Sequence, residues 1–563
     1  MKVGFERCIA AYSITTTLAI PLAHAMATLL RKAFDADAIT AVYDIVLAVA
    51  LVMLVSAFLS RQWPRGLSAY LSSLVVSLAT VIILALVDRS LLLPLLAVPL
   101  VCPVGVLLSN MIARRLPVWM DGSLHRFPVR TMLLVVLALL MVVQTARLSS
   151  WVSDPSQDWW ISTKNPLFAQ HMCMVAYIYA ADLNRQGVDN VYDQSYYPGL
   201  NPDADIRTTI NNLHPEDPYQ YPPQFLVLPR LAIALTNDFD LIKTFWLALQ
   251  ALFFGFIAWT VARFIGGQVG LMAALLIPLL WISFPVLANL QYGQFHLMSV
   301  FLAVAGMMWF ARRRYFLGGA SLAFAMLSKA APGILLIYLL AKRRWKEAGW
   351  TLGFCVAFSL LALMVVGTEP FVAFFTYQIP AIQNGSAFAF AEIWPEFRDL
   401  LIAGNQSPFA FVFKLGVLGL PGMSISLANT VHLVYTVLVF VVALLAARVN
   451  GNRHRQLLVW LALLNLAALV SKGAWGDYIP IGTIWLLTFM VSDMMATHKR
   501  KLLLAVVSVF MFLSLGVLPL PGLGDPAIFT SLAAVGMIIT IAFNAWVLFG
   551  RTPEVRTVSG ESP

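Results

Sequence analysis

The sequence predicts an all-α integral membrane protein, a polytopic bundle of about fourteen transmembrane helices. Hydrophobic residues make up 60% of its 563 residues and charged residues only 11%, and the mean hydropathy is +0.81. Soluble domains carry about 25% charged residues, so a chain this poor in charge has a surface that faces lipid. Apolar segments of about 20 residues, the length that crosses a bilayer, recur along the whole chain.

The basic residues indicate membrane topology rather than nucleic-acid binding. The net charge is +10, but lysines and arginines gather in short runs at the ends of apolar segments, as they do on the cytoplasmic side of membrane proteins. Nucleic acid is therefore not an expected partner. The four cysteines have no CxxC or other metal-binding spacing, so no metal site is expected; they are Cys8, Cys102, Cys173 and Cys355.

The candidate spans place the basic clusters, such as Arg312–Arg314 and Lys342–Lys346, on one side of the membrane if both termini are cytoplasmic. The first span is expected to be retained rather than cleaved as a signal peptide, because further spans follow it. Residues 224–236 are apolar but too few to cross. The candidate spans are 8–30, 41–60, 67–87, 91–112, 131–148, 240–262, 268–286, 293–311, 346–366, 424–448, 456–471, 477–494, 502–519 and 526–549.

Residues 315–341 form an apolar segment that enters the membrane and returns. Basic clusters flank both of its ends, so both ends are expected in the cytoplasm. Each half has about 12 to 14 residues and reaches about 18–21 Å, which is shorter than a hydrocarbon core of about 30 Å. The segment is predicted to be a pair of half-helices that meet at Ser328–Pro332, with the proline at the start of the second half-helix.

Lys329 lies at this predicted break, inside the apolar segment. The N-terminus of a half-helix has free N–H groups and a positive dipole end, and a lysine beside it adds a full charge. Together they predict an anion site suited to phosphate. The alternatives are a lysine that pairs with a buried carboxylate, and one whose ammonium extends to the cytoplasmic surface.

The first external segment holds the candidate acid–base residues. Asp154 and Asp158 follow a predicted span and lie beside Trp159 and Trp160, and His171 belongs to an amphipathic stretch, residues 166–186. A carboxylate at the membrane surface could act as general base on a hydroxyl, with the indole rings stacking on a sugar. The alternative is an ordinary aromatic belt with aspartates solvated in a loop.

Further polar side chains are expected on the same external face, above the broken helix pair. They occur in short stretches between apolar segments, where amides and rings can bind hydroxyl groups or simply make the loops polar. These residues are Tyr221 in a Tyr-Pro-Pro sequence, Tyr292, Gln294 and His296 at the mouth of a span, Asn405 and Gln406 in the second external loop, and Lys472, Trp475 and Asp477 before a late span.

These motifs resemble those of glycosyltransferase family 87, within the GT-C superfamily. The order and spacing agree over about residues 150–490, and the combination of five motifs is more specific than any one of them. The motifs are Tyr-x-Tyr-Pro-Pro at Tyr219–Pro223, Tyr-Gly-Gln at Tyr292–Gln294, a lysine followed by proline and then basic residues at Lys329–Arg344, Asn-Gln-Ser at Asn405–Ser407, and Ser-x-x-x-Trp-x-Asp at Ser471–Asp477.

The resemblance implies a GT-C-type bundle, with external amphipathic helices, and a domain organisation. Residues 1–130 would be four additional N-terminal transmembrane helices, and residues 131–495 a catalytic membrane core with external loops at 149–239 and 367–423. Residues 496–549 would be C-terminal transmembrane helices, and residues 550–563 a cytoplasmic tail.

The resemblance also implies an activity: transfer of one hexosyl or pentosyl residue, mannose above all, from a polyprenyl phosphate sugar to a lipid, polysaccharide or protein acceptor. The reaction would invert the anomeric carbon without metal or cofactor, at the periplasmic face of a bacterial inner membrane. Lys329, Gln294 and Tyr292 would bind the donor phosphate or lipid. The sugar or acceptor pocket would contain Tyr221, His296, Asn405, Gln406, Trp475 and Asp477.

The chain departs from the family pattern at two places. His296 stands where the family has asparagine, and the position of the family's catalytic aspartate falls near His171–Met172. Asp158 is the predicted base, with Asp154 or His171 as substitutes. The alternative functions are a flippase or transporter of lipid-linked sugars, since broken helices also occur at transport sites, and a catalytically inactive GT-C scaffold.

Overall fold

The computed structural model describes ten stretches of the chain. They form helices, with a single isolated β-bridge between Asn405 and Trp475, which confirms the predicted all-α fold class. The stretches are residues 4–34, 42–60, 66–116, 118, 128–153, 172–197, 218–388, 398–476, 479–496 and 526–550.

Within these stretches, 9 helices are long and apolar enough to cross a membrane, or up to 10 if a bent pair forms one span. The chain is therefore a multi-pass membrane protein, although the predicted count of about fourteen spans is not confirmed. The 9 helices are α1 (Phe5–Ala33), α2 (Val42–Ser60), α3 (Gly66–Val87), α5 (Ala97–Arg115), α7 (Pro128–Ser153), α11 (Phe239–Ile265), α18 (Trp345–Val366), α24 (Ile425–Ala446) and α28 (Pro526–Phe549).

The apolar run predicted as one span at 268–286 is divided into shorter helices. Prolines stand in the first turns of the second and third pieces, where a missing N–H and a fixed φ suit a helix start but break a continuing helix. The third piece and the helix after it are bent by 116°. The helices are α12 (Gly267–Leu275), α13 (Ile277–Trp281), α14 (Phe284–Gln291) and α15 (His296–Ala311).

The expected spans at 456–471 and 477–494 correspond to two helices of 16 residues, α25 (Arg453–Ala468) and α26 (Ile481–Ala496). The expected span at 502–519 lies outside the described residues. The predicted break at Ser328–Pro332 is confirmed, because α16 (Tyr315–Ser328) ends there and α17 (Gly333–Ala341) begins after it. Lys329 has extended backbone angles, which end the first half-helix.

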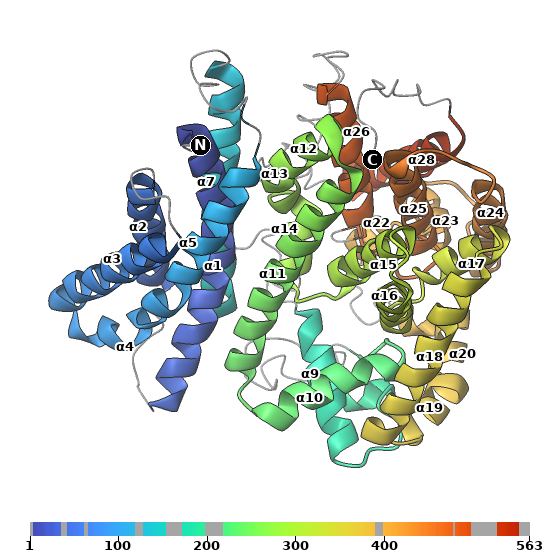
Figure 1. Cartoon of the computed structure of the whole chain (residues 1–563). Coiled ribbons are helices and arrows are strands. Elements are labelled where there is room, and N and C mark those ends of the chain that lie inside the picture. The colour runs from blue at the N-terminus through green and yellow to red at the C-terminus, as the bar shows by residue number, and fades with distance from the viewer. Residues whose placement is uncertain are drawn as a thin grey trace.

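The N-terminal helices pack around a hydrophobic core of their own, which includes Ile20, Ala23, Val49 and Cys102. They form one side of the molecule, drawn in blue in Figure 1, and α1 joins them to the rest by packing on α7 and α11. Ala19, Ala23 and Ala27 repeat at every fourth position of α1 and are buried. Such small residues allow membrane helices to approach closely.

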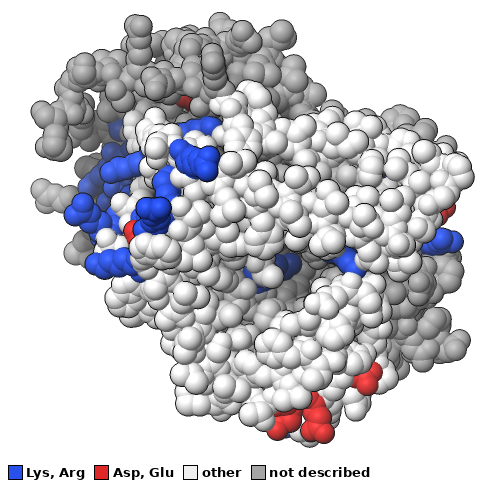
Figure 2. Space-filling model, turned by 90° about the vertical axis from the view of Figure 1, so that its right-hand side faces the viewer, with Lys and Arg blue, Asp and Glu red and all other residues white. Residues whose placement is uncertain are grey.

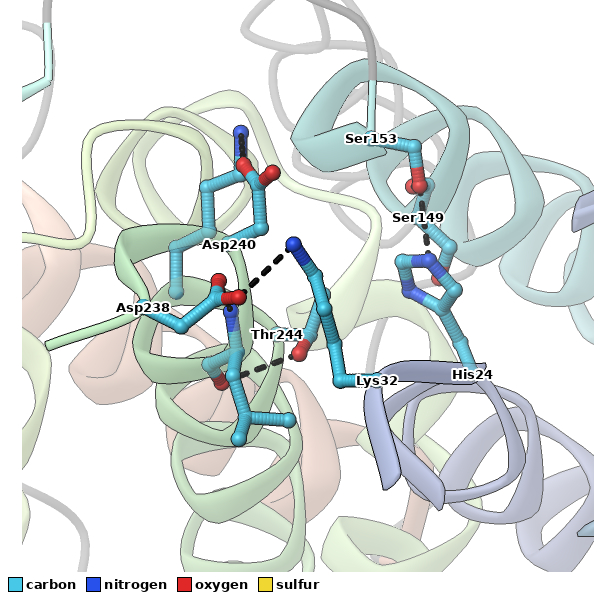
Figure 3. Close-up of polar contacts among 9 residues, drawn as sticks. His24, Lys32, Ser149, Ser153, Asp238, Asp240 and Thr244 are labelled. Atoms are coloured by element: carbon cyan, nitrogen blue, oxygen red, sulfur yellow. Dashed lines mark hydrogen bonds and ion pairs between the residues drawn. The ribbon is translucent and has the colours of Figure 1, made fainter. Parts of the chain in front are cut away.

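Polar side chains join α1 to both ends of the segment between α7 and α11 (Figure 3). Lys32 Nζ lies 2.7 Å from Asp238 Oδ2, and Asp238 caps α11 by accepting the Leu241 N–H at 3.0 Å. His24 Nε2 lies 2.7 Å from the hydroxyl of Ser153, the last residue of α7. Burial alone would raise the pKa of Asp238, but the Lys32 ammonium and the Leu241 N–H outweigh it and hold the pKa below its usual value.

The loops between spans contain short helices, and four of them, α9, α10, α19 and α20, lie together at one end of the molecule (Figure 1). The amphipathic stretch at residues 166–186 is helical from Cys173 to Arg185, where α9 lies. The short helices are α9 (Cys173–Arg185), a 3-10 turn at Pro223–Leu226, α10 (Val227–Leu235), α19 (Glu369–Ala373), a π-turn at Phe374–Gln378, α20 (Ile379–Asn384), α22 (Arg398–Gly404) and α23 (Pro408–Val417).

The charges separate along the direction in which the spans run. On the face shown in Figure 2, basic atoms cluster near one end and acidic atoms at the other, with a mostly uncharged band between them. The exposed residues Arg312–Arg314 and Glu369 illustrate the two signs. This separation is what the excess of positive charge on the cytoplasmic side of a membrane protein produces.

Candidate active site

A cavity of about 1000 Å³ lies between the broken helix pair, α24 and the segments that carry Tyr221 and Lys472. In Figure 2 it is visible as a hollow in the middle of the face, with basic atoms inside it. Its lining is mostly apolar, and the described lining residues include two lysines but no aspartate or glutamate. The polar lining residues that matter most are Tyr221, His296, Lys329, Asn429, Lys472 and Trp475.

Lys329 enters the cavity from the break between α16 and α17. Its side chain is partly buried, and its Nζ lies 5.3 Å from the centroid of the Tyr221 ring, within cation–π range. Ile334 and Ile337 of α17 continue the lining on the apolar side. The cavity therefore offers a positive charge followed by an apolar wall.

Gln294 is hydrogen-bonded to the Tyr221 hydroxyl and fixes the position of this cavity-lining ring. Its Oε1 lies 2.7 Å from the Tyr221 hydroxyl and 2.8 Å from the Tyr177 hydroxyl, and it accepts the Phe295 N–H at 2.8 Å. Its Nε2 lies 3.4 Å from the Cys173 sulfur, at the start of α9. Gln294 is only 2% exposed and does not line the cavity. It acts on the site through Tyr221, whose ring faces Lys329.

The Tyr-x-Tyr-Pro-Pro motif is fixed by hydrogen bonds to its own backbone. The Tyr219 hydroxyl donates to the Pro222 carbonyl at 3.1 Å, and the Tyr192 hydroxyl donates to the Tyr221 carbonyl at 3.0 Å. Burial raises the pKa of both Tyr192 and Tyr219 well above the usual value. Both phenols therefore stay protonated and remain donors at physiological pH.

Gly293, between Tyr292 and Gln294, adopts a left-handed φ of 62°. A Cβ added here would stand 2.9 Å from the Cβ of Met174 in α9, a contact too short to be tolerated. The Tyr292 carbonyl also accepts the Met174 N–H at 3.2 Å. The Tyr-Gly-Gln motif thus allows α9 to approach the start of α15.

We expect Gly293→Ala to destabilise the protein more than Gly187→Ala. Both glycines have positive φ, which costs an alanine about 1–2 kcal/mol, but nothing lies within 4 Å of a Cβ at Gly187. Overpacking against Met174 adds about 1–3 kcal/mol at Gly293. Thermal unfolding of the two variants in the same detergent measures the difference. Equal melting temperatures would contradict this account of the motif.

Asn405 serves as a brace and is not part of the cavity lining. Its Nδ2 donates to the Lys472 carbonyl at 2.7 Å, and its Oδ1 accepts the N–H groups of Ser407 at 3.0 Å and Ala474 at 3.1 Å. The Gln406 N–H donates to the Ala474 carbonyl at 2.6 Å. Asn405 and Gln406 therefore fix the loop that carries Lys472 and Trp475 into the cavity.

Lys472 lies at the rim formed by this loop, α20 and α24. Its Nζ donates to the Gln383 carbonyl and, at 2.6 Å, to Asn429 Oδ1, and it lies 4.8 Å from the centroid of the Phe409 ring. The residue is 5% exposed, and burial lowers the pKa of its ammonium.

The structure thus brings together part of the predicted site. Tyr221, His296, Lys329 and Trp475 line the cavity. Tyr292 and Gln294 are buried behind it, and Asn405 and Gln406 brace one of its loops. The described residues contain no group of three or more side chains suited to a metal ion. The predicted residues Asp154, Asp158, His171 and Asp477 lie outside the described part of the chain.

Three contributors were not among the predicted site residues. Asn429 and His432 line the cavity from α24. This helix is mostly apolar, and no motif marks the two residues. Tyr177 lies on α9 and reaches Gln294 across a sequence separation of 117 residues. Their positions follow from how distant helices pack, and neither motif nor spacing indicates them.

The comparisons with known proteins give one match. Residues 219–471 match the sequence model of glycosyltransferase family 87, which is consistent with the GT-C superfamily. The matched region begins at the Tyr-x-Tyr-Pro-Pro motif, ends at Ser471 and includes Lys329 and Gln294. Neither the search of curated proteins nor the search of solved structures returned a match. Residues 219–471 are therefore similar to glycosyltransferase family 87, which supports a glycosyltransferase activity for this chain with its several membrane-spanning helices.

Proposed function

We propose that the protein transfers a single sugar, mannose above all, from a polyprenyl phosphate sugar to a lipid, polysaccharide or protein acceptor. The observation that carries the proposal is Lys329, at a helix break, in a cavity whose described lining has basic but no acidic side chains. A lysine in a membrane segment indicates a functional group by default. The adjoining apolar wall suits the alkyl chain of the carrier.

The proposed reaction is one displacement at the anomeric carbon. The acceptor hydroxyl attacks that carbon while the bond to the phosphate oxygen breaks, so the configuration inverts and the lipid phosphate leaves with the electron pair. A base takes the hydroxyl proton, and we assign this role to Asp158, with Asp154 and His171 as substitutes. The Lys329 ammonium stabilises the charge on the leaving phosphate, so the step needs no metal ion.

The other residues position the substrates. Gln294 and Tyr292 act on the donor end by holding Tyr221 and the start of α9. Trp475 and His296 line the cavity with Tyr221 and would contact the sugar or acceptor, where rings stack on sugar faces. Asp477 is assigned to the same pocket. The active site would face the periplasm of a bacterial inner membrane, on the side away from the basic clusters.

We expect purified protein to bind a polyprenyl phosphate and Lys329→Met to lose about tenfold to a hundredfold in affinity, because a hydrogen bond to a charged group contributes about 1.5–3 kcal/mol. Native mass spectrometry with a synthetic polyprenyl phosphate measures the binding. Lys346→Met is the matched control, since Lys346 is exposed, its Nζ lies 4.1 Å from the centroid of the Tyr315 ring, and it is not among the cavity-lining residues. Absence of binding by the unmutated protein would overturn the proposal.

A further inference from the structure

The cavity holds two separate positive charges. Lys329 lies over the Tyr221 ring, whereas Lys472 lies over the Phe409 ring. Lys329 lies at the end of α16, whereas Lys472 donates a hydrogen bond to Asn429 of α24. Both lysines line the same cavity, together with His296 and His432. Lys329 therefore lies beside Tyr221, and Lys472 lies with Asn429 and His432 of α24 in a second group of polar lining residues.

The charge of Lys472 is not neutralised by the described residues. Its two hydrogen-bond acceptors, the Gln383 carbonyl and Asn429 Oδ1, are both neutral oxygens. No aspartate or glutamate pairs with it in the part of the chain that the structure describes. An ammonium has three protons, and two are used here. Burying a charge without a counter-charge is costly, so a site of this kind suits an anionic ligand.

His432 adds an available donor one turn further along α24. It lines the cavity, and its Nδ1 is buried with no hydrogen-bond partner among the described residues. Asn429 and His432 are three positions apart and so lie on one face of the helix. The same helix contributes Val439 and Phe440 to the lining, and Phe440 is 47% exposed. The wall thus changes from polar to apolar and reaches the lipid-facing surface of α24.

We propose that Lys472, His432 and Asn429 form a second anion-binding site, which binds a phosphate group of the acceptor while Lys329 serves the donor. This inference rests on the proposed function and narrows its acceptor to a lipid with its own phosphate. The third ammonium proton of Lys472 and the Nδ1 of His432 supply the hydrogen bonds. The alkyl chains lie along Val439 and Phe440 and leave the cavity beside α24.

Native mass spectrometry in detergent tests the second site with two probes, a synthetic polyprenyl phosphate and phosphatidylglycerol. Phosphatidylcholine with the same acyl chains is the uncharged comparison. We expect the unmutated protein to bind both anionic probes at once and to prefer phosphatidylglycerol to phosphatidylcholine at least tenfold. Lys472→Met should lose that preference and keep the polyprenyl phosphate, and Lys329→Met should do the reverse. Lys346→Met should change neither.

His432→Leu keeps the test informative if Lys472→Met does not fold, because it leaves both hydrogen bonds of Lys472 in place. It should weaken phosphatidylglycerol binding and leave polyprenyl phosphate binding unchanged. Displacement of one anionic probe by the other would overturn the second site, since it would mean one shared site. Unchanged phosphatidylglycerol binding in both variants would overturn it too. Absence of polyprenyl phosphate binding by the unmutated protein would instead contradict the proposed function.

Discussion

Gln294→Leu is expected to destabilise the protein by about 2–6 kcal/mol, because each buried polar group left without a partner costs about 1–3 kcal/mol. Gln294 Oε1 is the acceptor nearest to the Tyr177 and Tyr221 hydroxyls and to the Phe295 N–H. The two hydroxyls lie 2.9 Å apart and can bond to each other, so about two donors lose their acceptor. Tyr221 then no longer has a fixed position beside Lys329.

Thermal unfolding in detergent measures this loss, and Gln378→Leu is the matched control. Gln378 is 2% exposed, like Gln294, but its Nε2 has no hydrogen-bond partner among the described residues. The same substitution should therefore cost little there. Equal losses in Gln294→Leu and Gln378→Leu would show that the hydrogen bonds of Gln294 do not stabilise the site.

The sequence was most informative where charge and hydropathy act together. The break at Lys329 was predicted because basic clusters flank an apolar segment too short to cross twice, and the helices end and restart around it. The short external helix at Val227–Leu235 was expected not to cross for a similar reason of length. These are local physical constraints, since helix rise and bilayer thickness fix the minimum length of a span.

The sequence was least informative where the path of the backbone depends on single residues within apolar runs. Hydropathy treats Pro278 and Pro285 as part of a continuous span at 268–286, but they start new helices there. The 116° bend between α14 and α15 surrounds Gly293, whose left-handed φ no hydropathy average detects. The number of spans therefore could not be counted from composition alone.

The motifs located the candidate site but not the role of each residue. Asn405 was expected in the sugar or acceptor pocket. In the structure both its Nδ2 and its Oδ1 are hydrogen-bonded to backbone groups and fix the loop of Lys472. Gln294 was expected at the donor phosphate, but it does not line the cavity and instead accepts a hydrogen bond from the Tyr221 hydroxyl. Asn429 lines the cavity from an apolar helix. Such roles depend on contacts between residues far apart in the sequence, which spacing along the chain does not encode.

Asp158→Asn is expected to lower kcat by about 10²–10⁴-fold, the range that a general base supplies. Helix α7 ends at Ser153, whose hydroxyl is hydrogen-bonded to His24. Helix α9 begins at Cys173, whose sulfur is hydrogen-bonded to Gln294. All three candidate bases belong to the sequence between these two fixed points. The substitution is nearly isosteric, so lipid binding and the melting temperature should stay unchanged while transfer is lost.

Asp154→Asn and His171→Ala are the matched comparisons, and both should retain most of the transfer activity if Asp158 is the base. The pH dependence separates an aspartate from a histidine, because a base must be deprotonated to act. Aspartates in general titrate near pH 4 and histidines near pH 6.5. With an aspartate as base, kcat/KM measured with a synthetic polyprenyl phosphate sugar should stay level between about pH 5.5 and 8, and fall only in stronger acid. A fall centred near pH 6.5, together with lost activity in His171→Ala and unchanged activity in Asp158→Asn, would move the role of base to His171.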